Sequence, residues 1–147
     1  MATIERHVTR DLVALDGETT CAAAARRMAE QGIGSVAVRV QGRCIGLVTE
    51  RDLVTRVLAE GARPDLPIRQ AMRTDVPIVT PDTSEIECTR LMRDHLTRHL
   101  LVSEGGEVVG VVSMRDVIQL MLDEKEWLIG QLQTFISGHD GPHAASA

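Results

Sequence analysis

The sequence predicts an α/β (α+β) fold in which one β-α-β-β-α unit occurs twice. The first observation is an internal repeat: shifted by 64 positions, the chain matches itself without a gap from Ile4 to Glu60. In this register Val48 falls on Val112 and Asp52 on Asp116. The second observation is that short β-branched runs alternate with helical spacing in each copy. A fixed period of this kind is typical of a duplicated supersecondary unit.

Each copy contains the same elements in the same order. A short strand comes first, and a helix follows whose start is rich in Thr and Ser, residues that cap free backbone N–H groups. A hairpin with a glycine-bearing turn and a final helix complete the unit. In the first copy the strands are expected at 12–15, 36–40 and 44–48 and the helices at 18–32 and 50–60; in the second the strands are at 76–79, 100–102 and 108–112 and the helices begin at 82 and 114.

A single unit would leave one face of its sheet bare, so two units are expected to pack sheet to sheet with pseudo-two-fold symmetry. Along the chain we expect a first repeat at 1–62, a linker at 63–67 that contains two prolines, and a second repeat at 68–125. A helical extension at 126–137 and a disordered tail at 138–147 complete the chain.

Composition limits the partners. The formal net charge is −5, which disfavours nucleic acid and anionic membrane surfaces. One Trp, one Phe and no Tyr argue against a stacking platform for single-stranded nucleic acid. The sequence has neither an apolar run of about 20 residues nor a signal peptide, so we expect a cytoplasmic protein. Its histidines show no metal-ligand spacing.

Three cysteines, Cys21, Cys44 and Cys88, form no C-x-x-C pair. An odd number of unpaired thiols fits a reducing compartment. Packed thiols are the simplest interpretation, and a redox-responsive role is kept as an alternative.

A motif of the form G-x-V-[T/S]-x-R-D closes the hairpin of each copy, at 46–52 and at 110–116. Its hydroxyl lies at a helix start, where free N–H groups attract phosphate. Its Asp can accept hydrogen bonds from ribose hydroxyls, its Arg can bind phosphate, and its Gly would let a ligand approach the backbone. The same pattern also describes a helix N-cap with an acidic third residue, and the Gly can mark a bulge. The Arg, which capping does not need, favours a ligand slightly.

The unit order, the doubling and this motif resemble a pair of cystathionine-β-synthase-type (CBS) domains, or Bateman module, over residues 4 to 125. The segments 68–72 and 78–84 are especially typical. The resemblance implies a regulatory module, not an enzyme, that binds AMP, ADP or ATP in clefts between the paired repeats, with no catalytic cofactor and no metal. It also implies a homodimer and an effector protein regulated in trans. A ligand-free homodimeric scaffold is the alternative.

The resemblance also implies site residues. The closing motif contributes Thr49, Arg51 and Asp52 in the first copy and Ser113, Arg115 and Asp116 in the second. The adenine pockets are implied to be lined by Leu15, Gly34 and Ser35 in one cleft and by Ile78, Val79, Thr80, Arg98 and His99 in the other. Asp16 would repel phosphate in the first cleft, so we expect the second to be the better anion site.

The last segment, 116–136, has apolar residues at helical spacing beyond the end of the repeat. It contains the only Trp and the only Phe of the chain. Two interpretations stay open: the helix packs on its own body, or Trp127 and Phe135 bury against a partner subunit.

Overall fold

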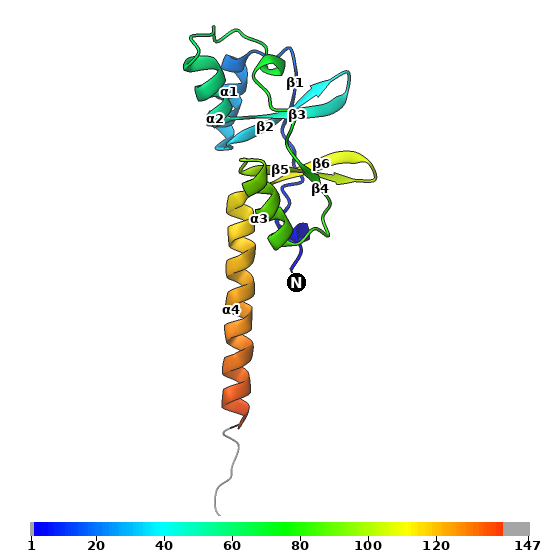
Figure 1. The fold of residues 1–147 in the computed structure, drawn as a ribbon, viewed down its shortest axis with the longest axis vertical. Helices are drawn as coiled ribbons and strands as arrows, with labels where there is room; N and C mark the ends of the chain where they lie inside the picture. The colour runs from blue at the N-terminus through cyan, green and yellow to red at the C-terminus, as the bar shows by residue number, and fades with distance from the viewer. Residues whose placement is uncertain (1, 140–147) are drawn as a thin grey trace, which may run out of the picture.

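The computed structural model describes residues 2–139, arranged as two similar α/β repeats and one long projecting helix (Figure 1). The first repeat has the sheet order β1-β2-β3, with β1 (Ala14–Asp16) parallel to β2 (Ser35–Val40) and β2 antiparallel to β3 (Arg43–Thr49). Its helices are α1 (Cys21–Gln31) and α2 (Glu50–Asp52), which continues as the π-helix η2 (Leu53–Leu58).

The second repeat has the same topology, which confirms the β-α-β-β-α unit. Its sheet order is β4-β5-β6, formed by β4 (Ile78–Val79), β5 (His99–Glu104) and β6 (Glu107–Ser113). Its helices are α3 (Glu85–Asp94) and α4 (Met114–His139). Short 3-10 helices precede the repeats, η1 (Ile4–His7) and η3 (Ile68–Gln70).

Local sequence accounts for the element boundaries. The Thr20 hydroxyl accepts a hydrogen bond from the Ala23 N–H at 3.1 Å and caps α1, and Ser84 caps α3 in the same way. Helix α1 ends at Gly32, whose φ of +61° is the left-handed conformation that glycine adopts easily. The hairpin turns place both central residues at positive φ, Gln41-Gly42 and Gly105-Gly106, as tight hairpins require.

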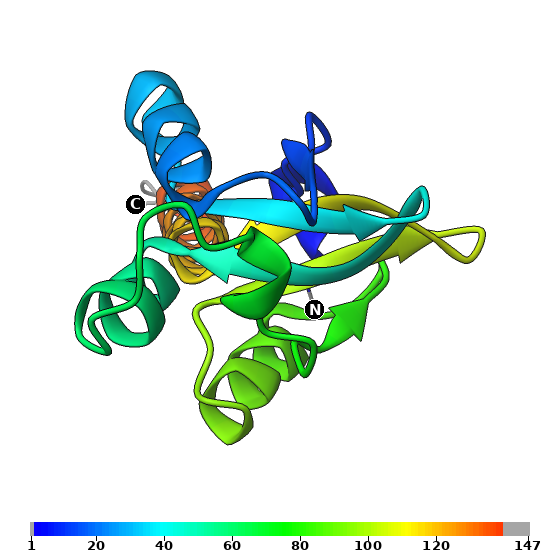
Figure 2. The same ribbon diagram turned by 90° about the horizontal axis from the view of Figure 1, so that it is seen from above.

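The two sheets face each other, and their hairpins lie one over the other when seen from above (Figure 2). A buried cluster joins Leu47 of β3 to Leu101 of β5 and to Val76, which precedes β4. This contact confirms that the repeats pack sheet to sheet and bury the face that a single unit would leave bare. Each repeat also keeps a core of its own between its sheet and its helices.

The leading segments of the two repeats are exchanged. Ile4 is buried in the core of the second repeat, and its N–H donates to the Thr83 carbonyl at 3.0 Å. Ile68 is buried in the core of the first repeat, and its N–H donates to the Thr19 carbonyl at 2.8 Å. Each core is therefore built from one repeat together with the leading segment of the other repeat. Neither core is complete without that segment.

Some boundaries differ from the sequence expectation. Strands β1 and β4 have three and two residues, because only these residues reach the neighbouring strand. The helix expected at 50–60 has one α turn and continues as a π-helix to Leu58. Helix α4 includes residues 138 and 139, which the sequence assigned to a tail, and 140–147 lie outside the described residues.

Candidate ligand site at the strand-to-helix corners

The closing motif forms a helix cap in both repeats. In the first, Asp52 Oδ2 accepts hydrogen bonds from the Thr49 N–H and hydroxyl, both at 2.9 Å, and the Asp52 N–H donates back to Thr49 Oγ1 at 3.2 Å. In the second, Asp116 Oδ2 accepts from the Ser113 N–H at 2.7 Å and hydroxyl at 2.8 Å, and the Asp116 N–H donates back at 3.2 Å. The capping interpretation is therefore confirmed twice. A ligand at either corner can therefore bind only to groups that the cap does not use, such as the Oδ1 atom of each Asp.

The two carboxylates differ in their second oxygen. Asp52 is 5% exposed, and its Oδ1 lies 3.8 Å from the Arg56 guanidinium, which also donates to the Met72 carbonyl at 2.8 Å. Asp116 is half-buried, and its Oδ1 has no hydrogen bond or ion pair to any residue from 2 to 139. The second corner therefore offers the more accessible carboxylate, with one oxygen that faces no cation.

The charges around the corners also differ. In the first repeat the Glu50 carboxylate lies beside Gly34, 3.8 Å from where a Cβ atom would stand. In the second repeat Met114 replaces Glu50 and Arg98 replaces Gly34, with the Met114 N–H donating to the Arg98 carbonyl at 2.8 Å. The first corner thus gathers two carboxylates, one of them facing Arg56, whereas the second combines one carboxylate with the added cation of Arg98.

The arginines of the second corner are available to an anion. Arg98 and Arg115 are exposed, and within the described part of the chain neither forms an ion pair. Arg51, at the position equivalent to Arg115, is exposed as well. It stands between Glu50 and Asp52, so part of its charge is neutralised locally.

His99 lies between the two corners. It pairs with Ser113 across the sheet, and its N–H donates to Thr97 Oγ1 at 3.3 Å. Burial lowers the pKa of the His99 imidazole, while the carboxylates of Asp116, Asp52 and Glu50 partly oppose this shift. Burial therefore favours the neutral imidazole, which can donate one hydrogen bond and accept another.

The structure disperses several of the remaining predicted lining residues. Val79 is buried in the core of the second repeat, so its side chain is committed to packing, whereas Ile78 is exposed. The Thr80 hydroxyl donates to the Asp82 carboxylate. Ser35 is half-buried and pairs with Thr49 at the first corner.

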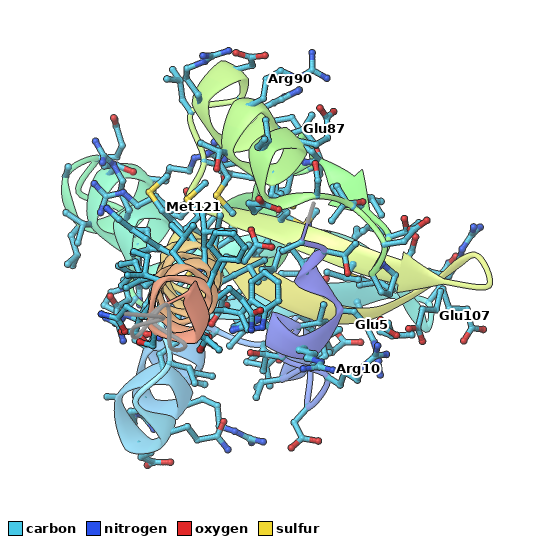
Figure 3. The ribbon with its side chains drawn as sticks, turned by 90° about the horizontal axis from the view of Figure 1, so that it is seen from below. Glu5, Arg10, Glu87, Arg90, Glu107 and Met121 are labelled. Atoms are coloured by element: carbon cyan, nitrogen blue, oxygen red, sulfur yellow. The ribbon has the colours of Figure 1, made fainter. Side chains whose placement is uncertain are left out.

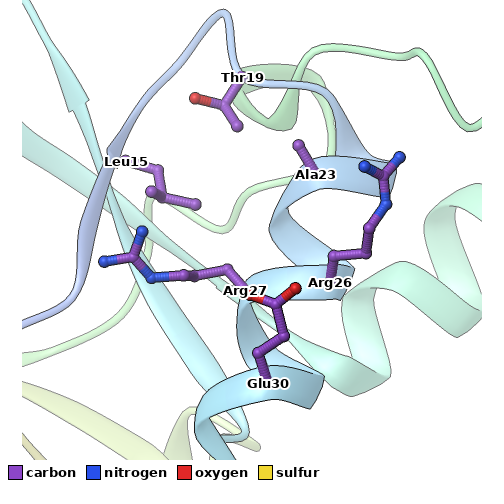
Figure 4. Close-up of a pocket in the computed structure, with 6 residues that line it drawn as sticks. All are labelled: Leu15, Thr19, Ala23, Arg26, Arg27 and Glu30. Carbon is purple, nitrogen blue, oxygen red and sulfur yellow. The ribbon is translucent and has the colours of Figure 1, made fainter.

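Leu15 lies in a separate open hollow of about 350 Å³ between β1 and α1 (Figure 4). The other residues around it are Thr19, Ala23, Arg26, Arg27 and Glu30. This hollow includes neither Gly34 nor the cap residues of the first corner. The lining assigned to the first cleft is therefore split between two places.

The glycine of the motif has a structural role that corrects the ligand-approach interpretation. A Cβ atom on Gly46 would stand 2.5 Å from the Arg73 carbonyl oxygen, and one on Gly110 would stand 2.6 Å from the Thr9 carbonyl oxygen. Arg73 and Thr9 belong to the exchanged leading segments, which bridge to Leu47 and Val111. These glycines admit the chain's own backbone and not a ligand. The bulge expected near them is present, after Val38 and Val102.

Sequence reasoning missed two residues of the first corner, Glu50 and Arg56. Glu50 could have been found, because the 64-residue shift places it on Met114 and so marks a difference in charge between the copies. The Arg56 contact to Asp52 could not, because i,i+4 spacing alone does not show which carboxylate oxygen is free.

The cysteines give little support to a redox role. Cys21 and Cys88 are buried and Cys44 is half-buried. Burial raises the pKa of all three thiols, that of Cys88 to about 11. The thiolate is the reactive form, so these thiols react slowly at neutral pH.

Metal-ligand clusters and helices able to span a membrane are both absent from the described residues. From residue 2 to 139, His, Cys, Asp and Glu side chains nowhere gather in threes as metal ligands would. Within the same residues, a helix with the length and hydropathy of a membrane span is not found.

Comparison with known proteins shows the family. The CBS domain model matches residues 4–59 and 68–123, which is most of the chain. The chain therefore belongs to the CBS-domain family, and it carries two CBS domains in tandem. The second match ends at residue 123, so residues 124–139 of α4 lie beyond the matched CBS domain.

Similar proteins occur in Acidianus ambivalens, Methanopyrus kandleri and Burkholderia ambifaria. An uncharacterized 17.7 kDa protein of Acidianus ambivalens is 32% identical and aligns with 94% of this chain and 85% of its own length. An uncharacterized protein of Methanopyrus kandleri is 38% identical over 76% of this chain, but this chain spans only 58% of that protein. The structure of a CBS-domain protein of Burkholderia ambifaria, for which a signal-transduction role has been suggested, is 30% identical with a TM-score of 0.74, covering 78% of this chain and 85% of that one.

Proposed function

We propose that this CBS pair is a regulatory module that binds an adenosine nucleotide, AMP, ADP or ATP, at the corner of its second repeat. In this proposal the nucleotide changes how the module acts on a partner protein. Catalysis has no role in it. The suggested signalling role of the Burkholderia ambifaria protein is in keeping with it.

The observation that carries the proposal is the free acceptor at the second corner. Asp116 is half-buried and its Oδ1 is unpaired among the described residues, so this oxygen can accept a hydrogen bond from a ribose hydroxyl. Arg98 and Arg115 supply cations for the phosphate, and charge-assisted hydrogen bonds are about twice as strong as neutral ones. The cap holds the carboxylate in place before a ligand arrives, which lowers the entropic cost of binding.

The first corner supports a weaker site. The free oxygen of its buried Asp52 carboxylate faces Arg56 at 3.8 Å, and Glu50 adds a negative charge beside Gly34. A phosphate at this corner would meet like charge at short distance. We therefore propose one principal nucleotide site, in the second repeat.

Thermal unfolding tests the proposal. The full chain is heated with AMP, ADP, ATP, NAD or inorganic phosphate, each up to millimolar concentration. A ligand at 100 times its dissociation constant adds about 2.7 kcal/mol of stability, which raises the unfolding temperature by several degrees. A rise with an adenosine nucleotide but not with phosphate supports the proposal. No rise with any nucleotide would leave the ligand-free scaffold as the better interpretation.

A further inference from the structure

Helix α4 carries an apolar face that is exposed in the described part of the structure. The helix has 26 residues and projects away from both repeats (Figure 1). Every residue from 121 to 138 is exposed except Gly130, which is half-buried. An exposed apolar surface of this length is unusual for a folded chain and marks an interaction site.

The apolar residues follow a heptad repeat. Positions a, d and e of three successive heptads are occupied by Ile118, Met121 and Leu122, then Lys125, Leu128 and Ile129, then Leu132, Phe135 and Ile136. We call these residues the α4 seam. Its apolar members are between 39% and 67% exposed. A sustained repeat of 3.5 residues keeps one face against a partner helix and is typical of coiled coils.

We infer that the α4 seam binds the α4 seam of a second copy in antiparallel orientation. The inference goes beyond the proposed function and does not depend on a nucleotide. In an antiparallel pair, a positions face d positions of the partner. The required register pairs residues whose numbers add up to 253, so that Met121 faces Leu132 of the other copy. The midpoint of this register, 126.5, is also the midpoint of α4 (114–139), so the two helices overlap along their full length.

Charge selects the antiparallel orientation. The charged residues of the distal helix cluster at 123–126, and the stretch 127–138 contains no Asp, Glu, Lys or Arg. In the antiparallel register, 123–126 lies against the uncharged stretch 127–130 of the second copy. In a parallel pair this cluster would face itself, and Lys125 would face Lys125 at an a position, which is destabilising.

In this pairing, the C-terminal end of α4 from one copy lies against a hollow in the second repeat of the other copy. A hollow of about 280 Å³ between α3 and α4 is lined by Ile86, Thr89, Arg90, Arg93 and Met121. Figure 3 shows Arg90 on α3 and Met121 on α4. The antiparallel register brings Leu132 and Ile136 of the second copy to this end of α4, where Ile86, 61% exposed, extends the apolar surface.

Trp127 is not part of the seam. At 100° per residue it lies opposite the centre of the a, d and e positions. Of the two residues expected from the sequence to bury against a partner subunit, only Phe135 lies on the seam.

Sedimentation of the full chain tests the pairing. The wild-type protein should sediment with twice the 16.0 kDa chain mass at micromolar concentration. Leu132→Glu puts a charge into the seam and should weaken the dimer at least about 100-fold. Thr134→Glu, which adds the same charge on the opposite face of the same turn, should leave it unchanged. A monomeric or tetrameric wild type, or a dimer that survives Leu132→Glu, would overturn the inference. Circular dichroism shows whether each variant keeps its fold.

Disulfide trapping tests the orientation. Met121→Cys and Leu132→Cys are made separately in a Cys44→Ser background, and one of the two chains carries a size tag. In the antiparallel pair the mixture forms a disulfide of intermediate size and neither variant links to itself, because like positions are about 16 Å apart along the axis. Self-linked Met121→Cys with no mixed product would show a parallel pair and contradict the inference.

Discussion

The two repeats share a fold in detail, but their corners differ in charge and in free acceptors. Both caps use the same three hydrogen bonds, and both hairpins bulge at the same place. Asp52 is nevertheless buried and faces Arg56, whereas Asp116 is half-buried with one oxygen open. Duplication has thus kept what folding requires in both copies and left the surroundings of the cap free to diverge. Equivalent substitutions should therefore change the free energy of unfolding equally where the two copies match and unequally where they differ.

The largest expected effect tests the shared part. Gly46→Ala and Gly110→Ala should each lower the free energy of unfolding by about 3 kcal/mol, because the added Cβ meets a backbone carbonyl of an exchanged segment. Urea unfolding measures the loss. Gly130→Ala is the control, since no heavy atom lies within 4 Å of its Cβ position, and it should be neutral or stabilising. Full stability of Gly110→Ala would mean that the exchanged segment does not approach β6 as described.

The next effect separates the two carboxylates. Asp52→Ala should lower the free energy of unfolding by about 2 kcal/mol, because it removes a cap and the buried partner of Arg56. Asp116→Ala should cost about 1 kcal/mol, the loss of a cap alone. The same urea experiment measures both variants. Equal losses would show that burial and the Arg56 contact make no difference between the corners.

The smallest effect concerns pH. Burial lowers the pKa of His99 in the folded state, so the unfolded chain binds a proton first as pH falls. The free energy of unfolding should therefore decrease as pH falls through about 6.5, the usual value for His. His99→Gln should reduce this slope between pH 7 and pH 5.5, while His95→Gln, on an exposed residue, should not. Unfolding temperatures measured across this range check the prediction, and a slope that stays unchanged in His99→Gln would contradict it.

The sequence predicted the repeated unit because hydrophobic period, caps and glycine turns are local signals. It also placed Thr49, Asp52, Ser113 and Asp116 at the strand-to-helix corners. The exchange of leading segments could not be predicted from the sequence, because Ile4 and Ile68 occupy equivalent positions and would suit either core. The role of Gly46 and Gly110 depends on this exchange and was missed with it.

The candidate site was predicted in part. The motif identified the corner residues but not which carboxylate oxygen the cap consumes, since this depends on side-chain rotamers. The preference for the second corner was inferred from Asp16, an exposed residue at the end of β1. The structure supplies a different reason, the Glu50 and Arg56 side chains around the first corner.

We propose that the second corner binds an adenosine nucleotide and that the first contributes little. Calorimetric titration of AMP, ADP and ATP into Arg115→Ala and Arg51→Ala tests it most directly, because these matched residues take no part in the caps. Loss of a charge-assisted contact is worth about 1.5–3 kcal/mol, so Arg115→Ala should weaken binding about 10- to 100-fold while Arg51→Ala stays near wild type. Equal weakening by both substitutions, or stronger weakening by Arg51→Ala, would contradict it.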